Sequence, residues 1–203
     1  MSTEATPTVL RVGYVPGVTT TKWRRIWAER LRRIRLDVVA VDQADQRRAI
    51  LDGAVDMCFV RNPIDIAGLH LIPLYDEVPV VWLSKDHLLA ALDEVTSDDL
   101  ADENVLTEAT PENIELATYS AAVLRVPLSV ARSGSRKDMI HLPVLDAEET
   151  HVGLAWRKGD ENPLLDEFVG VVRGRTANSS RTVAARDQRE GGTTRTRRSS
   201  HRR

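Results

Sequence analysis

The stretch that decides the fold is Leu10-Arg-Val-Gly-Tyr-Val-Pro-Gly-Val-Thr-Thr-Thr21, read together with the segment that follows it as far as Val60. Its apolar periodicity predicts that three strands alternate with two helices. The strands are expected over 10–14, 36–41 and 57–60, and the helices directly after the threonines and over 46–52. This order favours a parallel sheet with right-handed crossovers, so we expect an α/β fold.

The three threonines are the first candidate binding residues. In open parallel sheets, ligands bind beyond the carboxyl ends of the strands. The corresponding rim is expected to consist of residues 15–21, 42–45 and 61–63. Thr19, Thr20 and Thr21 offer hydroxyls and backbone N–H groups at the positive end of a helix, where a small carboxylate can bind. Alternatively, one threonine caps the helix and the others are solvated, because capping uses the same geometry.

Arg61 ends the third predicted strand at the same rim. Its guanidinium is suited to bidentate recognition of a carboxylate. Two uses therefore remain open: a contact with a ligand, or a surface ion pair with Asp45 or Asp65.

The rest of the chain to residue 172 continues the α/β pattern. Trp23 and Trp27 lie on the apolar face of the first helix and are expected in the core. Further strands are expected over 69–74, 78–83, 105–106, 123–126, 140–145 and 152–156. Further helices are expected over 114–123, after Pro127, and over 163–172.

Composition places the chain among soluble proteins. It has 203 residues, of which 42% are hydrophobic and 29% are charged, as is usual for globular domains. No apolar run approaches the roughly 20 residues that a membrane helix needs, and the first residues lack the features of a secretory signal. The single cysteine, Cys58, cannot form an internal disulfide. These features predict a cytoplasmic protein without membrane contact.

Charge is distributed unevenly along the chain. Residues 173–203 contain ten arginines and two acids, or +8, whereas the whole chain has a net charge of −2, so the rest carries −10. This tail contains no Leu, Ile or aromatic residue, and we expect it to be disordered, like residues 1–8. The tail is suited to contact nucleic acid through its phosphates, or another acidic partner. A solvated tail without a specific role is the alternative.

Residues that could support catalysis do not form a recognisable set. The five histidines show no metal-ligand spacing with Cys58 or with one another. Neither a phosphate-binding loop nor a nucleophile elbow is present. Cys58 lies in an apolar strand, where a cysteine behaves as a small hydrophobe. We therefore expect no metal, no cofactor and no enzymatic activity.

Several short motifs occur in an order that is similar to one known family. The chain resembles the effector-binding domain of LysR-type transcriptional regulators over about residues 9–172. The segments that carry the resemblance are Leu10–Tyr14, Ala49–Val60, Leu71–Val81, Lys85–Ala90, Val126–Ala131 and Gly153–Arg157.

The resemblance implies a periplasmic-binding-protein-like fold of type II, in which crossover strands join two α/β lobes. Lobe I would comprise about 9–83 and 151–172, and lobe II about 84–150. A small anionic effector would bind between the lobes, and a homodimer is expected because family domains often pair side by side. The candidate ligand-binding residues are then Thr19, Thr20, Thr21, Asp42, Arg61, Thr107, Thr118, Tyr119 and Ser120.

Three features depart from the family pattern. Only nine residues precede the first predicted strand, so we expect an effector domain without its own helix-turn-helix. The segment Ala117–Arg125 lacks the glycines that the family usually has there, and lobe II is short. The resemblance also leaves a second function open, since some small biosynthetic enzymes, including menaquinone-pathway and prephenate-processing types, are similar to binding proteins of this class. Asp42, Asp45 and Glu108 are then the acid–base candidates.

Overall fold

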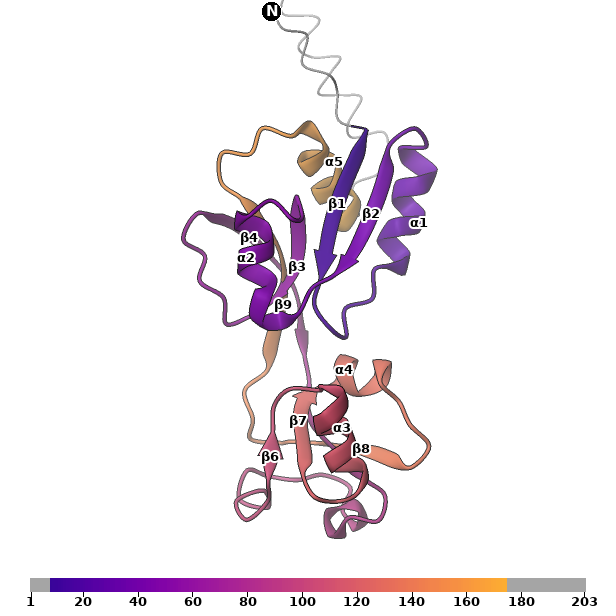
Figure 1. The fold of residues 1–203 in the computed structure, drawn as a ribbon, viewed down its shortest axis with the longest axis vertical. Helices are drawn as coiled ribbons and strands as arrows, with labels where there is room; N and C mark the ends of the chain where they lie inside the picture. The colour runs from indigo at the N-terminus through magenta and orange to yellow at the C-terminus, as the bar shows by residue number, and fades with distance from the viewer. Residues whose placement is uncertain (1–7, 175–203) are drawn as a thin grey trace, which may run out of the picture.

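Two lobes, each built on its own sheet, make up residues 8–174 in a computed structural model (Figure 1). Most of the two predicted disordered segments, 1–8 and 173–203, lies outside these described residues. The exceptions belong to the folded part. The carbonyl of Thr8 accepts a hydrogen bond from the amide of Arg35 at 2.9 Å, and Arg173 and Gly174 form the turn that ends the last helix.

Lobe I contains a five-stranded sheet in the order β2-β1-β3-β9-β4. Strands β1, β2 and β3 are parallel, as predicted, whereas β9 is antiparallel to both β3 and β4. The lobe is therefore formed by two separate parts of the chain. Its elements are β1 (Val9–Tyr14), α1 (Thr21–Arg30), β2 (Arg35–Ala40), the 3-10 helix η1 (Gln43–Asp45), α2 (Gln46–Leu51), β3 (Met57–Arg61), β4 (Leu69–Glu77), β9 (Thr150–Arg157) and α5 (Pro163–Val172).

Lobe II contains a four-stranded sheet in the order β6-β7-β5-β8. β6 and β7 are parallel, and β5 is antiparallel to β7 and β8. Its elements are β5 (Pro79–Ser84), the 3-10 helix η2 (Leu88–Ala91), β6 (Val105–Leu106), α3 (Pro111–Thr118), β7 (Val123–Pro127), α4 (Leu128–Ser133) and β8 (Met139–Pro143).

The boundary between the lobes lies at Val78 and not at residue 83 as expected. β4 does not break at residue 75. It continues to Glu77 because Tyr75, Asp76 and Glu77 pair with β9 after an irregularity that begins at Pro73. β5 then starts at Pro79 and pairs only within the sheet of lobe II. The chain thus crosses between the lobes at Val78, between β4 and β5. It returns to lobe I at β9 (Figure 1).

The helix expected over 114–123 is shorter and begins earlier. Thr110 caps α3, because its hydroxyl accepts a hydrogen bond from the amide of Asn113 at 3.2 Å. The helix ends at Thr118, and Ser120 has a positive φ of 57° that cannot continue it. By contrast, α5 has the predicted bounds, with Asn162 as its cap.

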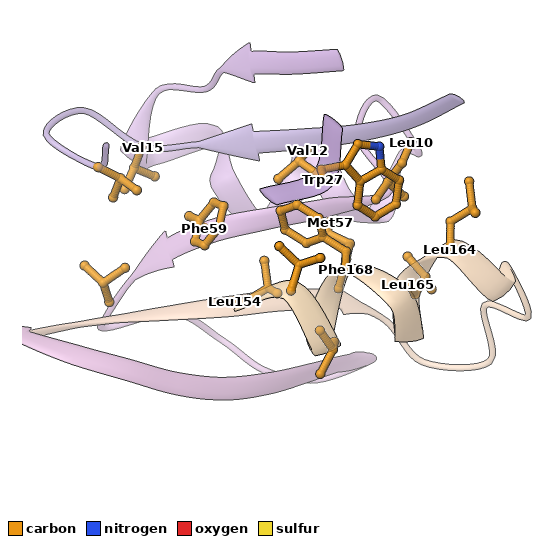
Figure 2. Packing of buried hydrophobic residues seen from close by; sticks show 14 residues of the cluster. Leu10, Val12, Val15, Trp27, Met57, Phe59, Leu154, Leu164, Leu165 and Phe168 are labelled. Carbon is orange, nitrogen blue, oxygen red and sulfur yellow. The ribbon is translucent and has the colours of Figure 1, made fainter. Parts of the chain in front are cut away.

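Aromatic side chains from distant segments form the core of lobe I (Figure 2). The rings of Trp27 on α1 and Phe168 on α5 lie 5.7 Å apart, and Phe168 also contacts Phe59 of β3 edge to face. Trp27 is buried and donates to the carbonyl of Ile34 at 2.9 Å, whereas Trp23 is half-buried and stacks on Phe59 at 4.4 Å. Both tryptophans therefore belong to the core region, as predicted.

Among the helices within residues 8–174, none has the length and apolar character needed to span a membrane.

A pair of leucine substitutions tests this packing. Leu165 of α5 is 4% exposed in the lobe I core, and Leu88 is 90% exposed. Leu165→Ala is expected to lower the free energy of unfolding by about 2–5 kcal/mol, because it removes buried apolar contacts and leaves a cavity. Leu88→Ala should change it by less than about 0.5 kcal/mol. Urea denaturation followed by circular dichroism measures both, and equal effects would contradict this account of the core.

Candidate functional site

The end of lobe I that faces lobe II carries the threonine turn. β1 runs toward lobe II (Figure 1), and the turn after it leads into α1 at Thr21. Thr20 occupies the N-cap position, but its side chain makes no capping hydrogen bond, and Thr19 and Thr21 are exposed. The hydroxyls of this turn are therefore not used to cap the helix, and they lie beside its N-terminal amides.

Two other predicted residues follow the ends of strands, one in each lobe. Asp42 is exposed after β2, and its carboxylate does not cap η1. Thr107 is exposed after β6. β6 runs parallel to β7, and β7 ends where the amide of Leu128 donates to the carbonyl of Val78 at 2.9 Å. Thr107 therefore lies on the end of lobe II that is nearer to lobe I.

Three predicted residues lie at the opposite end of lobe II, and the expectation that they face the cleft is wrong. α3 leads from the end of β6 back to the start of β7, so Thr118, Tyr119 and Ser120 lie away from lobe I. The hydroxyl of Thr118 donates to the carbonyl of Ile114 at 2.8 Å and contacts the sulfur of Met139 inside the lobe. Tyr119 is 76% exposed on the outer surface.

Arg61 is not on the surface, although it ends β3 at the predicted rim. It is 2% exposed, and its partner is Glu77, which ends β4. Nε of Arg61 lies 2.5 Å from Oε2 of Glu77, and Nη2 lies 3.1 Å from Oε1. Arg61 thus makes the bidentate contact that its chemistry favours, but with a carboxylate of the protein itself.

The remaining bonds of Arg61 hold the turn after β1 and the start of the 3-10 helix η1. Nη1 donates to Oε1 of Gln43 at 2.9 Å, and Nη2 donates to the carbonyl of Pro16 at 2.8 Å. The side chain of Gln46 bonds both the amide and the carbonyl of Arg61, at 2.8 and 2.9 Å. Four of the five guanidinium N–H groups are therefore occupied by the protein itself, and the side chain is buried.

The surface partners expected for Arg61 are engaged elsewhere. Asp45 pairs with Arg48 at 2.8 Å, and Asp65 pairs with Arg47 at 3.1 Å. The ion-pair interpretation of Arg61 is thus correct in kind but wrong in its partner. In the sequence Glu77 follows Asp76 in a short polar stretch between two apolar segments. Only the fold brings the end of β4 near the end of β3, with β9 between them.

Glu77 accepts hydrogen bonds from both lobes. The hydroxyl of Thr150 in β9 donates to Oε2 at 3.3 Å, and the hydroxyl of Ser129 in α4 donates to Oε1. The carboxylate also affects Tyr75, whose pKa is raised by partial burial and then by the negative charge of Glu77, while Arg61 lowers it. Sequence reasoning missed Glu77, Ser129 and Thr150 as members of the site.

Gly17 brings the lobes into direct contact beside this network. It has a φ of +88°, and a Cβ there would lie 2.5 Å from Oγ of Ser129 and 2.8 Å from the amide nitrogen of Val130. The turn after β1 therefore packs against the first residues of α4, and only glycine fits between them.

The described residues do not assemble a reactive centre from the predicted candidates. Burial raises the pKa of the Cys58 thiol to about 12, so the thiol stays protonated and inert at neutral pH. Within residues 8–174, no group of three His, Cys, Asp or Glu side chains has a metal-binding arrangement. Asp42 and Asp45 lie on lobe I, whereas Glu108 lies on lobe II, and the structure does not pair them.

Comparisons with known proteins agree with this architecture. A family model described as the LysR substrate binding domain matches residues 7–113. The HTH-type transcriptional regulator AlsR of Bacillus subtilis is 21% identical over 177 residues, which cover 72% of this chain and 59% of AlsR. The chain thus spans about three fifths of the length of that regulator.

Solved structures show the same fold at low identity. The effector binding domain of a BenM variant superimposes with a TM-score of 0.71 at 18% identity, covering 85% of this chain and 96% of that one. The OxyR regulatory domain of Pseudomonas aeruginosa gives 0.67 at 19% identity, covering 81% and 96%. The BenM domain with its effector benzoate gives 0.67 at 19% identity, covering 85% and 93%.

Substitution of the buried arginine tests the network. Arg61→Met is expected to lower the free energy of unfolding by about 3–5 kcal/mol, because it leaves Glu77 buried without its cation. Arg35→Met is the matched control, since Arg35 forms an exposed ion pair with Asp37 at 2.7 Å and should cost at most about 1 kcal/mol. Chemical denaturation of both variants decides the point, and an Arg61→Met cost no larger than the control would contradict it.

Proposed function

The chain belongs to the LysR substrate binding domain family, and we propose that it binds a small anionic effector, most simply a carboxylate, between its two lobes. The family model covers more than half of the chain, and the two-lobed fold matches regulatory domains of this type. Ligand binding would shift the closure of the lobes and alter association with a partner. In this proposal, the domain regulates and does not catalyse.

The observation that carries the proposal is the unused threonine turn at the start of α1. A helix N-terminus has amides without intrahelical partners and a partial positive charge. The hydroxyl of Thr20 makes no capping bond, and the exposed cation Lys22 follows it. Such a turn combines donors and positive charge, which a carboxylate requires. One similar structure contains benzoate, which is a carboxylate, and this supports the choice of ligand class.

The other predicted ligand-binding residues have different proposed roles. Asp42 and Thr107 remain proposed contributors because both are exposed at strand ends of the rim. Arg61 is proposed to act indirectly, by holding the turn at Pro16 and the 3-10 helix that begins at Gln43. The proposal for a nucleic acid or acidic partner of the tail rests on composition alone, because 175–203 lie outside the described residues.

A thermal-shift screen against small carboxylates, with benzoate included, tests the proposed function. A ligand at a hundredfold excess over its Kd stabilises the folded protein by about 2.7 kcal/mol, which should raise Tm by about 5 °C or more for a domain of this size. Thr20→Val should weaken binding about tenfold or more, because a hydrogen bond to a charged group is lost.

Thr118→Val is the matched control for this experiment. Its hydroxyl bonds within lobe II, so the ligand-induced shift, measured from the variant's own Tm, should equal that of the parent. A cooperative melt with no shift by any carboxylate would remove the support for the proposal. A hit that Thr20→Val leaves unchanged would place the ligand elsewhere.

A second proposal concerns self-association, and a specific charge pattern favours it. The segment 22–35 carries seven cations and one acid, and a groove of about 630 Å³ lies along α1 and β2. Arg24, Arg25, Arg32 and Arg35 line it above an apolar floor that includes Leu31 and Ile34.

The outer face of α3 is complementary to this groove. Glu112, Glu115, Leu116 and Tyr119 are all exposed there, and their spacing places them on one stripe of the helix. An antiparallel homodimer would bring the α1 groove of each copy against α3 of the other, and a twofold axis would close the assembly.

Charge reversal tests this dimer by sedimentation. Arg24→Glu with Arg32→Glu in one chain, and Glu112→Lys with Glu115→Lys in another, should each shift the protein toward monomer through like-charge repulsion. An equimolar mixture of the two should sediment as a dimer again, because both contacts regain opposite charges. Arg136→Glu, on an exposed part of lobe II, should leave association unchanged. A parent chain that is monomeric, or a mixture that stays monomeric, contradicts the proposal.

A further inference from the structure

We propose that Glu77 and Ser129 form a latch that sets the closure of the two lobes and thereby positions the ligand-binding loops. The positioning of a ligand rests on the proposed function, whereas the latch itself is a property of the free protein. The inference starts from the distribution of the hydrogen-bond partners of Glu77 over the two lobes.

Glu77 and two of its partners, Arg61 and Thr150, all belong to lobe I. Its carboxylate is buried, and the two bonds from Arg61 at 2.5 and 3.1 Å fix the orientation of the carboxylate plane. Thr150 donates from the neighbouring strand β9, which pairs with β4 at this position. Arg61, Thr150 and Glu77 all lie on the sheet of lobe I, so a movement between the lobes leaves these bonds intact.

Ser129 is the partner that moves with lobe II. It lies in the first turn of α4, which packs on the sheet of lobe II. Its hydroxyl does not cap the helix, because Pro127 occupies the N-cap position, and it donates instead to Oε1 of Glu77. Among the described residues, Ser129 is the side chain of lobe II that bonds this carboxylate. A rotation of lobe II that carries α4 away from Glu77 breaks that bond.

The same closure brings a backbone contact into place. Gly17 touches Ser129 and the amide of Val130, with space for no larger residue. Pro16, the preceding residue, accepts from Arg61 at 2.8 Å. Glu77 is therefore connected through Arg61 to the turn that leads to Thr19–Thr21, and through Ser129 to lobe II. Closure of the lobes and the position of the threonine turn are coupled through one carboxylate.

The coupling has a direct consequence for the ensemble of the free protein. A charge-assisted hydrogen bond made only in the closed arrangement favours that arrangement. Removal of the Ser129 hydroxyl should populate more open arrangements, although the folds of both lobes stay intact. Ser129 is thus a positioning residue, since it acts on the threonine turn through Glu77 and Arg61.

Distances between spin labels on the two lobes test the latch in the absence of any ligand. The chain with Lys137→Cys and Lys158→Cys places one exposed label on each lobe, and the buried Cys58 thiol, with a pKa of about 12, does not react under labelling conditions. Pulsed electron–electron double resonance should give one narrow distance distribution for this labelled parent. Addition of Ser129→Ala should broaden the distribution or add a second population.

Ser133→Ala is the matched control on the same helix. Its hydroxyl donates to the carbonyl of Val130 at 2.8 Å within lobe II, so its distribution should superimpose on that of the parent. Gly17→Ala should also shift the distribution, because its Cβ would collide with Ser129. Circular dichroism confirms that each variant is folded.

An unchanged distribution for Ser129→Ala overturns the latch, and so does an equal change for Ser133→Ala. Neither result bears on carboxylate binding, which the thermal-shift screen measures separately. Conversely, a failed carboxylate screen leaves the distance distributions as they are. The two proposals can therefore fail independently.

Discussion

The buried pair of Arg61 and Glu77 is the constraint on which the arrangement of the lobes depends. A buried charge is costly unless a partner and further hydrogen bonds satisfy it, and here each charge has several. The donors and acceptors come from β3, β4, β9, α4, the 3-10 helix η1 and the turn after β1. Satisfying this buried pair thus requires these segments to meet at one point, and the junction between the lobes is organised around that requirement.

Local patterns were sufficient to predict most elements of the fold. The bounds of α5 follow from its cap and its apolar spacing, and the parallel strands β1 to β3 follow from their alternation with helices. The errors occur where tertiary pairing decides. Tyr75–Glu77 has a polar sequence typical of a turn, yet β9 keeps it in a strand. Likewise, α3 was placed too late because Thr110 was not recognised as its cap.

The candidate site was predictable only in part, for a similar physical reason. The threonine turn follows from a strand and a helix that are adjacent in the sequence, so local reasoning places it correctly on the rim. Arg61 looks like a surface cation because its true partner lies sixteen residues away in the sequence, on a strand that a distant segment brings close. Thr118, Tyr119 and Ser120 were misplaced because a short helix reverses the direction of the chain between two parallel strands.

The insertion of lobe II between β4 and β9 has a consequence for how the chain folds during synthesis. Residues 79–149 are contiguous, and their sheet is complete once β8 has been made. Lobe I is different, since its core needs Phe168 beside Trp27 and Phe59. The first part of lobe I therefore lacks a complete core until lobe II and then α5 have been synthesised. The downstream lobe is therefore able to fold before the lobe that carries the threonine turn is complete, although the first strands of that lobe are translated earlier.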